Sequence, residues 1–155
     1  GAWVEITEDL TEPTFVWDTR TVADGRYELH ITASDEPSNV APQAMTGSRI
    51  TEPVTVDNTA PAIRNGAARR DGRNATVQGR ATDALSRIVT LAYSVDSADE
   101  WHVVLPTDGI CDSTDEPFSF DVEDLDVGAH QITVRAVDVY GNIGYASVEV
   151  TVPTP

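Results

Sequence analysis

The sequence contains no lysine and only one cysteine among its 155 residues. All ten basic residues are arginines, and 26 acidic residues oppose them, which gives a formal net charge of -16. A phosphate backbone is bound by basic side chains that neutralise its charge, so this balance argues against nucleic acid and anionic membranes as partners. The single Cys111 excludes an intrachain disulfide and a multi-thiolate metal site, and we interpret it as a small buried apolar residue.

Long apolar runs and catalytic motifs are missing as well. No apolar run reaches the roughly 18 residues that a membrane-spanning helix needs, so we expect no membrane insertion. The sequence has no Gly-x-Ser-x-Gly, no phosphate-binding glycine loop and no His-Glu-x-x-His motif. We therefore expect no enzyme. Hydrophobic residues make up 40% of the chain, which is enough for packed cores.

An internal repeat organises the chain. Residues 25–35 align with residues 128–138 without a gap, at an offset of about 100 residues, and the same offset matches Phe15 with Phe118. Each copy has a glycine turn, then an alternating segment, then a polar turn rich in Asp, Asn, Pro or Gly. The repeat predicts two related modules rather than one domain.

Apolar and polar side chains alternate at residues 27–33 and again at residues 130–136. This alternation is typical of a half-buried antiparallel strand, so we expect one continuous strand in each copy. A last strand should follow each of them, at residues 50–56 and 145–152. The second copy also predicts strands at residues 62–66, 75–81, 88–95 and 101–105.

The second copy resembles known modules over nearly all of residues 57–155. The residues that carry the likeness are 93–96, Trp101, Pro106, Asp108, Gly109, 118–120, Leu125, Gly128, His130, Ala136, Asp138, Gly141 and Asn142. They are similar to fibronectin type III domains and to the bacterial immunoglobulin-like modules of exported or sensor proteins, which often follow a β-propeller. The resemblance implies an all-β fold of tandem immunoglobulin/fibronectin type III-like β-sandwiches, the first one truncated.

The same resemblance gives two residues a structural role. Tyr27 occupies the place of the tyrosine corner, whose hydroxyl bonds the backbone a few residues upstream. His130 stands at the equivalent place in the second copy, and we interpret it as a polar corner residue with a satisfied ring nitrogen rather than a metal ligand.

The module boundary is placed just before the polar segment of residues 57–61, which ends in proline. Residues 57–155 then form a complete sandwich, whereas residues 1–56 match only the C-terminal half of a module. Half a sandwich exposes an apolar face and a free sheet edge. We therefore predict that residues 1–56 either form a partial sheet supported by contacts outside themselves or are mobile.

Oxygen-rich turns are the candidates for metal binding. The hard oxygen donors that Ca²⁺ prefers gather at Asp35 with Asn39, at Asp138 with Asn142, and in residues 112–116. A site near the boundary would involve Asp57. The alternative is that these side chains only cap their turns, so the expected cofactor is none, with a weak structural Ca²⁺ left open.

Aromatic rings are the candidates for ligand binding, because flat apolar surfaces with polar neighbours suit sugars. The candidate rings are those of Trp3, Trp17, Trp101, Tyr140 and Tyr145. Tyr140, in a turn, is the ring that we expect to be exposed and to contact a ligand. Trp17 and Trp101 are expected to pack inside, since Trp17 aligns with Phe120 and Trp101 begins a strand.

These observations favour a non-catalytic structural or interaction module of a larger exported bacterial protein. The resemblance implies an extracellular, cell-surface or periplasmic location, with other domains of the same polypeptide as partners. The alternative is an accessory module that binds carbohydrate or supports Ca²⁺-dependent adhesion, with a glycan or another protein as partner.

Overall fold

The computed structural model describes residues 2–40 and 42–154. Packing divides the chain into two compact units, Gly1–Asn58 and Thr59–Pro155. The described residues form strands and a single 3-10 turn, which confirms the all-β expectation. No helix among them is long and apolar enough to cross a bilayer.

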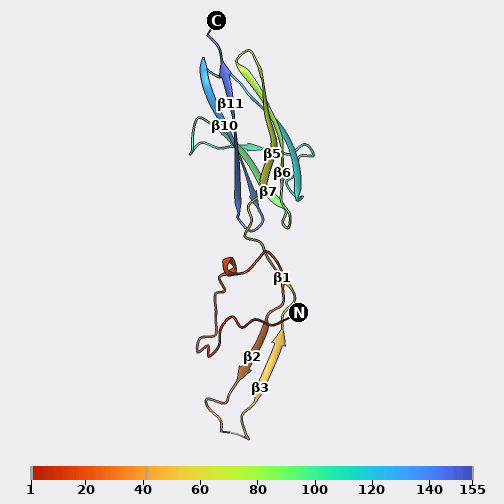
Figure 1. Ribbon diagram of the computed structural model, residues 1–155, viewed down its shortest axis with the longest axis vertical. Coiled ribbons are helices and arrows are strands. Elements are labelled where there is room, and N and C mark those ends of the chain that lie inside the picture. The colour runs from red at the N-terminus through yellow and green to blue at the C-terminus, as the bar shows by residue number, and fades with distance from the viewer. Residues whose placement is uncertain (1, 41, 155) are drawn as a thin grey trace. The chain divides into compact units, whose positions relative to one another are not determined.

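The second unit is a sandwich of two antiparallel sheets (Figure 1). One sheet has the strand order β11-β10-β7-β8 and the other the order β5-β6-β9. The strands are β5 (Ala62–Asp71), β6 (Asn74–Thr82), β7 (Ile88–Val95), β8 (His102–Val104), β9 (Asp115–Val122), β10 (Gly128–Asp138) and β11 (Ile143–Val152). The architecture is that of an immunoglobulin-like sandwich.

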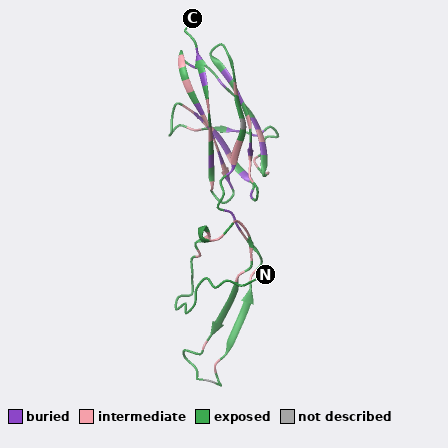
Figure 2. Ribbon diagram, in the orientation of Figure 1, coloured by how far each residue is buried: buried purple, intermediate pink, exposed green. Residues whose placement is uncertain are grey.

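Alternation along the strands builds the core between the two sheets. On β10, Ile132, Val134 and Ala136 are each at most 3% exposed, while the residues between them are only half-buried. Ala75 and Val77 of β6 face them from the other sheet, also buried. Figure 2 shows the buried residues concentrated on the strands of this unit. Each fully buried Val, Leu or Ile contributes about 1.5–3 kcal/mol of transfer free energy.

The start of β11 packs tightly against the point where the chain enters the second unit. A Cβ atom at Gly144 would overlap the backbone carbonyl of Pro61, so only glycine fits there. β11 ends at Val152, eight residues beyond Gly144. At about 3.3 Å per residue, the entry point and the end of β11 lie about 26 Å apart, at opposite ends of the sandwich.

Cys111 is half-buried and packs against the core cluster. Desolvation, followed by the negative charge of Glu116, raises the pKa of its thiol. The cysteine therefore behaves as a small apolar residue at neutral pH.

The first unit is built from four short strands and the 3-10 turn η1 (Thr19–Thr21). They are β1 (Gly25–Tyr27), β2 (His30–Ser34), β3 (Thr46–Ile50) and β4 (Val54–Val56). They pair as two separate two-stranded sheets, β1 with β4 and β2 with β3. Every residue of β2 and β3 is exposed, and this part of the chain has no counterpart of β5, β6 or β7 among its described residues.

The expected continuous strand at residues 27–33 was wrong, as was the single strand at residues 50–56. Both predicted strands are interrupted where Leu29 lies opposite Thr51, because a side chain takes part in the hydrogen bonding between these two residues. The Leu29 N–H donates to the Thr51 hydroxyl at 3.1 Å, and the Thr51 N–H donates to the Leu29 carbonyl at 2.9 Å. Pro53 follows, and it has no N–H for the ladder.

Candidate cation site

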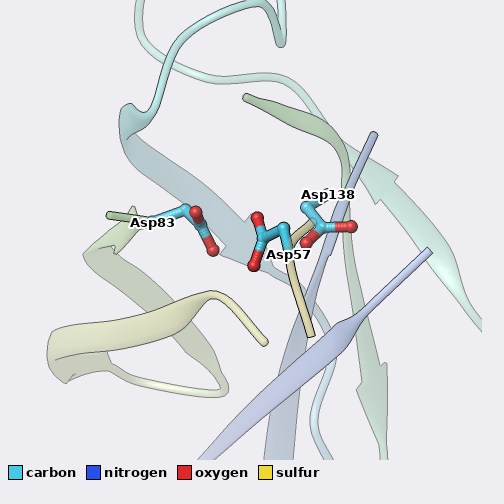
Figure 3. Close-up of side chains that lie close together, drawn as sticks. All are labelled: Asp57, Asp83 and Asp138. Atoms are coloured by element: carbon cyan, nitrogen blue, oxygen red, sulfur yellow. The ribbon is translucent and has the colours of Figure 1, made fainter. Parts of the chain in front are cut away.

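Two aspartates of the second unit, one directly after a strand and one at the end of a strand, have carboxylate oxygens close together (Figure 3). Asp83 follows β6, Asp138 ends β10, and Asp57 follows β4 in the short segment that leads to β5. One carboxylate oxygen of Asp83 lies within 4.8 Å of one of Asp138. Asp57 and Asp138 are buried, with exposures of 7% and 1%, and Asp83 is half-buried.

Asp138 holds the turn between β10 and β11. Its Oδ1 accepts hydrogen bonds from the backbone N–H groups of Tyr140 and Asn142, at 2.8 and 2.9 Å. Its Oδ2 accepts one from the side-chain amide of Asn142 at 2.7 Å. The predicted pair of Asp138 and Asn142 is therefore brought together, with the amide donating to the carboxylate.

Asp83 organises the loop after β6 in the same way. Its Oδ1 accepts hydrogen bonds from the backbone N–H groups of Leu85 and Ser86 and from the Ser86 hydroxyl. Its Oδ2 is buried and has no hydrogen-bond donor. One oxygen thus fixes the loop, and the other is left without a donor among the described residues.

Close carboxylates repel one another strongly when they are buried. At 4.8 Å the repulsion is about 3 kcal/mol per pair for an effective dielectric constant of about 20. Neither Asp83 nor Asp138 forms a salt bridge with a described residue. A cation would offset this repulsion. Two oxygens that bind one Ca²⁺ at about 2.4 Å can be up to about 4.8 Å apart, so the spacing fits a shared Ca²⁺.

The other predicted oxygen-rich turns use their carboxylates as caps. Asp35 accepts the Met45 N–H at 2.6 Å through its side chain, and its carbonyl accepts the Asn39 N–H at 2.9 Å. In residues 112–116, the buried Glu116 accepts the N–H groups of Asp112 and Ser113. Both arrangements are those of capped turns.

Sequence reasoning named Asp57 and Asp138 separately and passed over Asp83 as a ligand. All three share one signal, an aspartate at the end of a strand, as in Val56-Asp57, Thr82-Asp83 and Val137-Asp138. Many other aspartates in this acidic chain also lie near strand ends. Only the sandwich topology shows which ends meet.

The two corner residues make equivalent hydrogen bonds. The Tyr27 hydroxyl donates to the Ala23 carbonyl at 2.6 Å, and His130 Nε2 lies 2.8 Å from the Asp126 carbonyl, again four residues upstream. His130 Nδ1 lies 2.6 Å from Asp96 Oδ2. Both partners of His130 are acceptors, so both ring nitrogens donate when the imidazole is protonated. The Asp126 carbonyl and then the Asp96 carboxylate raise the pKa of His130.

The aromatic candidates differ in their surroundings. Tyr140 is 52% exposed in its turn, and Trp17 is half-buried against Tyr27 in a T-shaped contact. The expectation that Trp101 packs inside was wrong. It is half-buried on the outer face of the four-stranded sheet, because it stacks on Arg135, which alternates with the inward residues of β10.

Comparison with known families places this fold. Residues 55–134 match the family described as bacterial Ig domain, a span that includes Asp57 and ends within β10. No curated protein matches the chain. Bacterial Ig domains are typically non-catalytic modules of exported surface proteins. The match covers just over half of the chain, and the chain therefore belongs to the bacterial Ig domain family.

Proposed function

We propose that this chain is a structural and interaction module of a larger exported protein, and that its second unit keeps the segments attached to its two ends a fixed distance apart. The observation that carries the proposal is the position of entry and exit. The chain enters beside Gly144 at the start of β11 and leaves after Val152 at the other end of that strand.

The sandwich between these two points has the features of a rigid spacer. β11 pairs with β10 along ten residues, from Ile143–Val137 to Val152–Gly128, and β10 pairs in turn with β7. The apolar face of this sheet is buried in one core cluster against β6 and β9. A fully paired and packed sheet does not stretch without losing its hydrogen bonds and core contacts together.

A distance measurement between spin labels tests this proposal. The exposed Ala60 and Thr154 are replaced by cysteine in a Cys111→Ser background and labelled, and the distance is measured by pulsed electron resonance. A spacer gives a narrow distribution near 30 Å, whereas an unfolded chain of this length gives a broad one near about 50 Å. A broad or multimodal distribution under native conditions would rule out the spacer role.

As a second function we propose that the second unit binds Ca²⁺ through Asp83 and Asp138. The observation behind it is the buried Oδ2 of Asp83, which has no donor among the described residues and belongs to a carboxylate close to that of Asp138. Extracellular modules bind Ca²⁺ with dissociation constants of about 0.1–1 mM. At 10 mM Ca²⁺ and a dissociation constant of 1 mM, the gain in stability is about 1.4 kcal/mol.

Thermal melts with 10 mM CaCl₂ and with EDTA test the Ca²⁺ proposal, with NaCl added to equal ionic strength because salt alone screens the charge of -16. Ca²⁺ should raise the melting temperature of the wild type and not that of Asp83→Asn. Asp35→Asn is the matched control, since this carboxylate caps a different turn, and it should keep the response. An equal response in Asp83→Asn would refute the site.

A further inference from the structure

The outer face of the four-stranded sheet carries an open hollow of about 670 Å³, within the size range of about 300–1,000 Å³ for small-ligand sites. It lies between the loop after β7 and the outward side chains of β10 and β11. Its lining residues are Asp96, Ser97, Ala98, Trp101, Gln131, Thr133 and Tyr145. None of them takes part in the carboxylate group described above.

Two aromatic side chains, Trp101 and Tyr145, line this hollow. The Trp101 indole N–H donates to the Ala98 carbonyl at 2.9 Å, which sets the direction of the ring. The ring centres of Trp101 and Tyr145 are 6.1 Å apart, and their planes are inclined at 51°. Tyr145 is 58% exposed although it lies on a well-paired strand. The two rings therefore form an angled pair that is partly open to solvent.

Arg135 lies beside these rings without an acidic partner. Its guanidinium carbon is 4.3 Å from the centre of the Trp101 ring, and its backbone pairs with that of Tyr145. Its Nε is buried without an acceptor, and Arg135 forms no salt bridge with a described residue. The stacked guanidinium therefore supports the Trp101 ring and helps to hold it at the edge of the hollow.

Polar side chains complete the rim. The Ser97 Oγ accepts the N–H groups of Asp99 and Glu100, so its own hydroxyl hydrogen remains to be donated. Gln131 points outward between the buried Ile132 and the half-buried His130, and it offers both a donor and an acceptor. The hollow thus combines two flat apolar surfaces with several separate polar groups.

We propose that this hollow binds a neutral oligosaccharide, with the apolar face of a sugar ring on Trp101 and Tyr145 and its hydroxyls on Gln131 and Ser97. Aromatic rings with polar tips bind such amphipathic surfaces well. The net charge of -16, together with Asp96 in the lining, repels an acidic glycan at long range. The openness of the hollow suits a chain that runs across it rather than an enclosed ligand.

This inference goes beyond the spacer role and does not depend on it. A spacer needs no ligand, and the spin-label distance would be unchanged by the loss of the Trp101 or Tyr145 ring. Failure of sugar binding and failure of the spacer proposal are therefore separate results.

Affinity gel electrophoresis tests the inference, with a soluble β-1,3-glucan, a xylan and a galactomannan as neutral probes and polygalacturonate as the acidic one. At least one neutral polysaccharide should retard the wild-type chain. Trp101→Ala and Tyr145→Ala should each weaken the affinity at least tenfold. The matched control is Tyr140→Ala, which removes a ring of similar exposure, 52%, that does not line the hollow, and it should bind like the wild type.

Three results would overturn the proposal: no retardation by any neutral polysaccharide, retardation by polygalacturonate alone, or binding that survives both ring deletions. Thermal melts check that the variants are folded. Tyr145 is exposed on the surface, so Tyr145→Ala keeps the test decisive even if Trp101→Ala fails to fold.

Discussion

The two copies of the repeat have the same local pattern and very different burial. Ile31 in the first copy is 56% exposed, whereas its counterpart Val134 is 3% exposed. Phe15 and Phe118 differ in the same way, at 47% and 2%. The second copy has β5, β6 and β7 to cover and pair with its strands, and the first has no such strands among its described residues. Alternation therefore specifies a strand, but burial depends on the strands that cover it.

The corner residues show that a local hydrogen bond forms without covering strands. Tyr27 and His130 each bond a backbone carbonyl four residues upstream, although only His130 belongs to a packed sandwich. The corner is local in sequence, so it forms in both copies. The core is assembled from segments distant in sequence, so it forms in the second copy, which has the covering strands.

The largest expected effect separates the two equivalent phenylalanines. Phe118→Ala leaves a cavity in the core and should lower the free energy of unfolding of the second unit by about 3–5 kcal/mol. Phe15→Ala removes a half-exposed ring and should lower the free energy of any unfolding transition by less than about 1 kcal/mol. Urea denaturation followed by circular dichroism measures both. Equal losses would mean that the first copy has a core of its own.

Glycines give a second comparison of packing. Gly144→Ala forces a Cβ atom into the Pro61 carbonyl and should destabilise the second unit by about 1–3 kcal/mol. Gly47→Ala, on β3 of the first unit, meets no atom within 4 Å and should be neutral or stabilising by up to about 1 kcal/mol. The same denaturation experiment measures both changes. A harmless Gly144→Ala would contradict the close approach of β11 to the entry point.

The smallest effect concerns the corner histidine. The pKa of His130 is raised in the folded chain, so its bonds stabilise fully below the unfolded pKa of about 6.5 and are lost as pH rises through the folded pKa. His130→Tyr, which copies the first unit, should abolish this loss between pH 6 and 9. The expected change in the free energy of unfolding is below about 1 kcal/mol, because the Asp96 carboxylate is 47% exposed.

The pKa of Asp96 is lowered, first by the Gln131 N–H and then by His130. Its contribution is therefore present above about pH 3.8 and is lost as pH falls through the lowered pKa. Urea denaturation midpoints measured from pH 3 to 9 would show both losses of stability, that of Asp96 at low pH and that of His130 at high pH. His102→Gln, at an exposed position of β8, serves as the control and should keep the wild-type dependence of the midpoint on pH. If the midpoint of His130→Tyr depends on pH between 6 and 9 as that of the wild type does, the imidazolium does not stabilise the fold.

Sequence predicted the parts of the fold that repeat or alternate. The strands expected at residues 75–81 and 88–95 correspond closely to β6 and β7, whereas β5 extends five residues beyond its expected end. The break between β1 and β2 was not predictable from alternation, because it depends on a bond from Leu29 to Thr51 on the partner segment. For the same reason Asp83 was missed, since its neighbours are brought to it by the sandwich topology.

The opposite positions of entry and exit have a mechanical consequence. Tension on the ends of the second unit pulls along β5 at its start and along β11 at its end. The hydrogen bonds between antiparallel strands run across the strands, so this tension shears the whole β10–β11 ladder at once instead of opening it one bond at a time. Such parallel loading distributes the force over many hydrogen bonds, so the ladder resists until many of them break together.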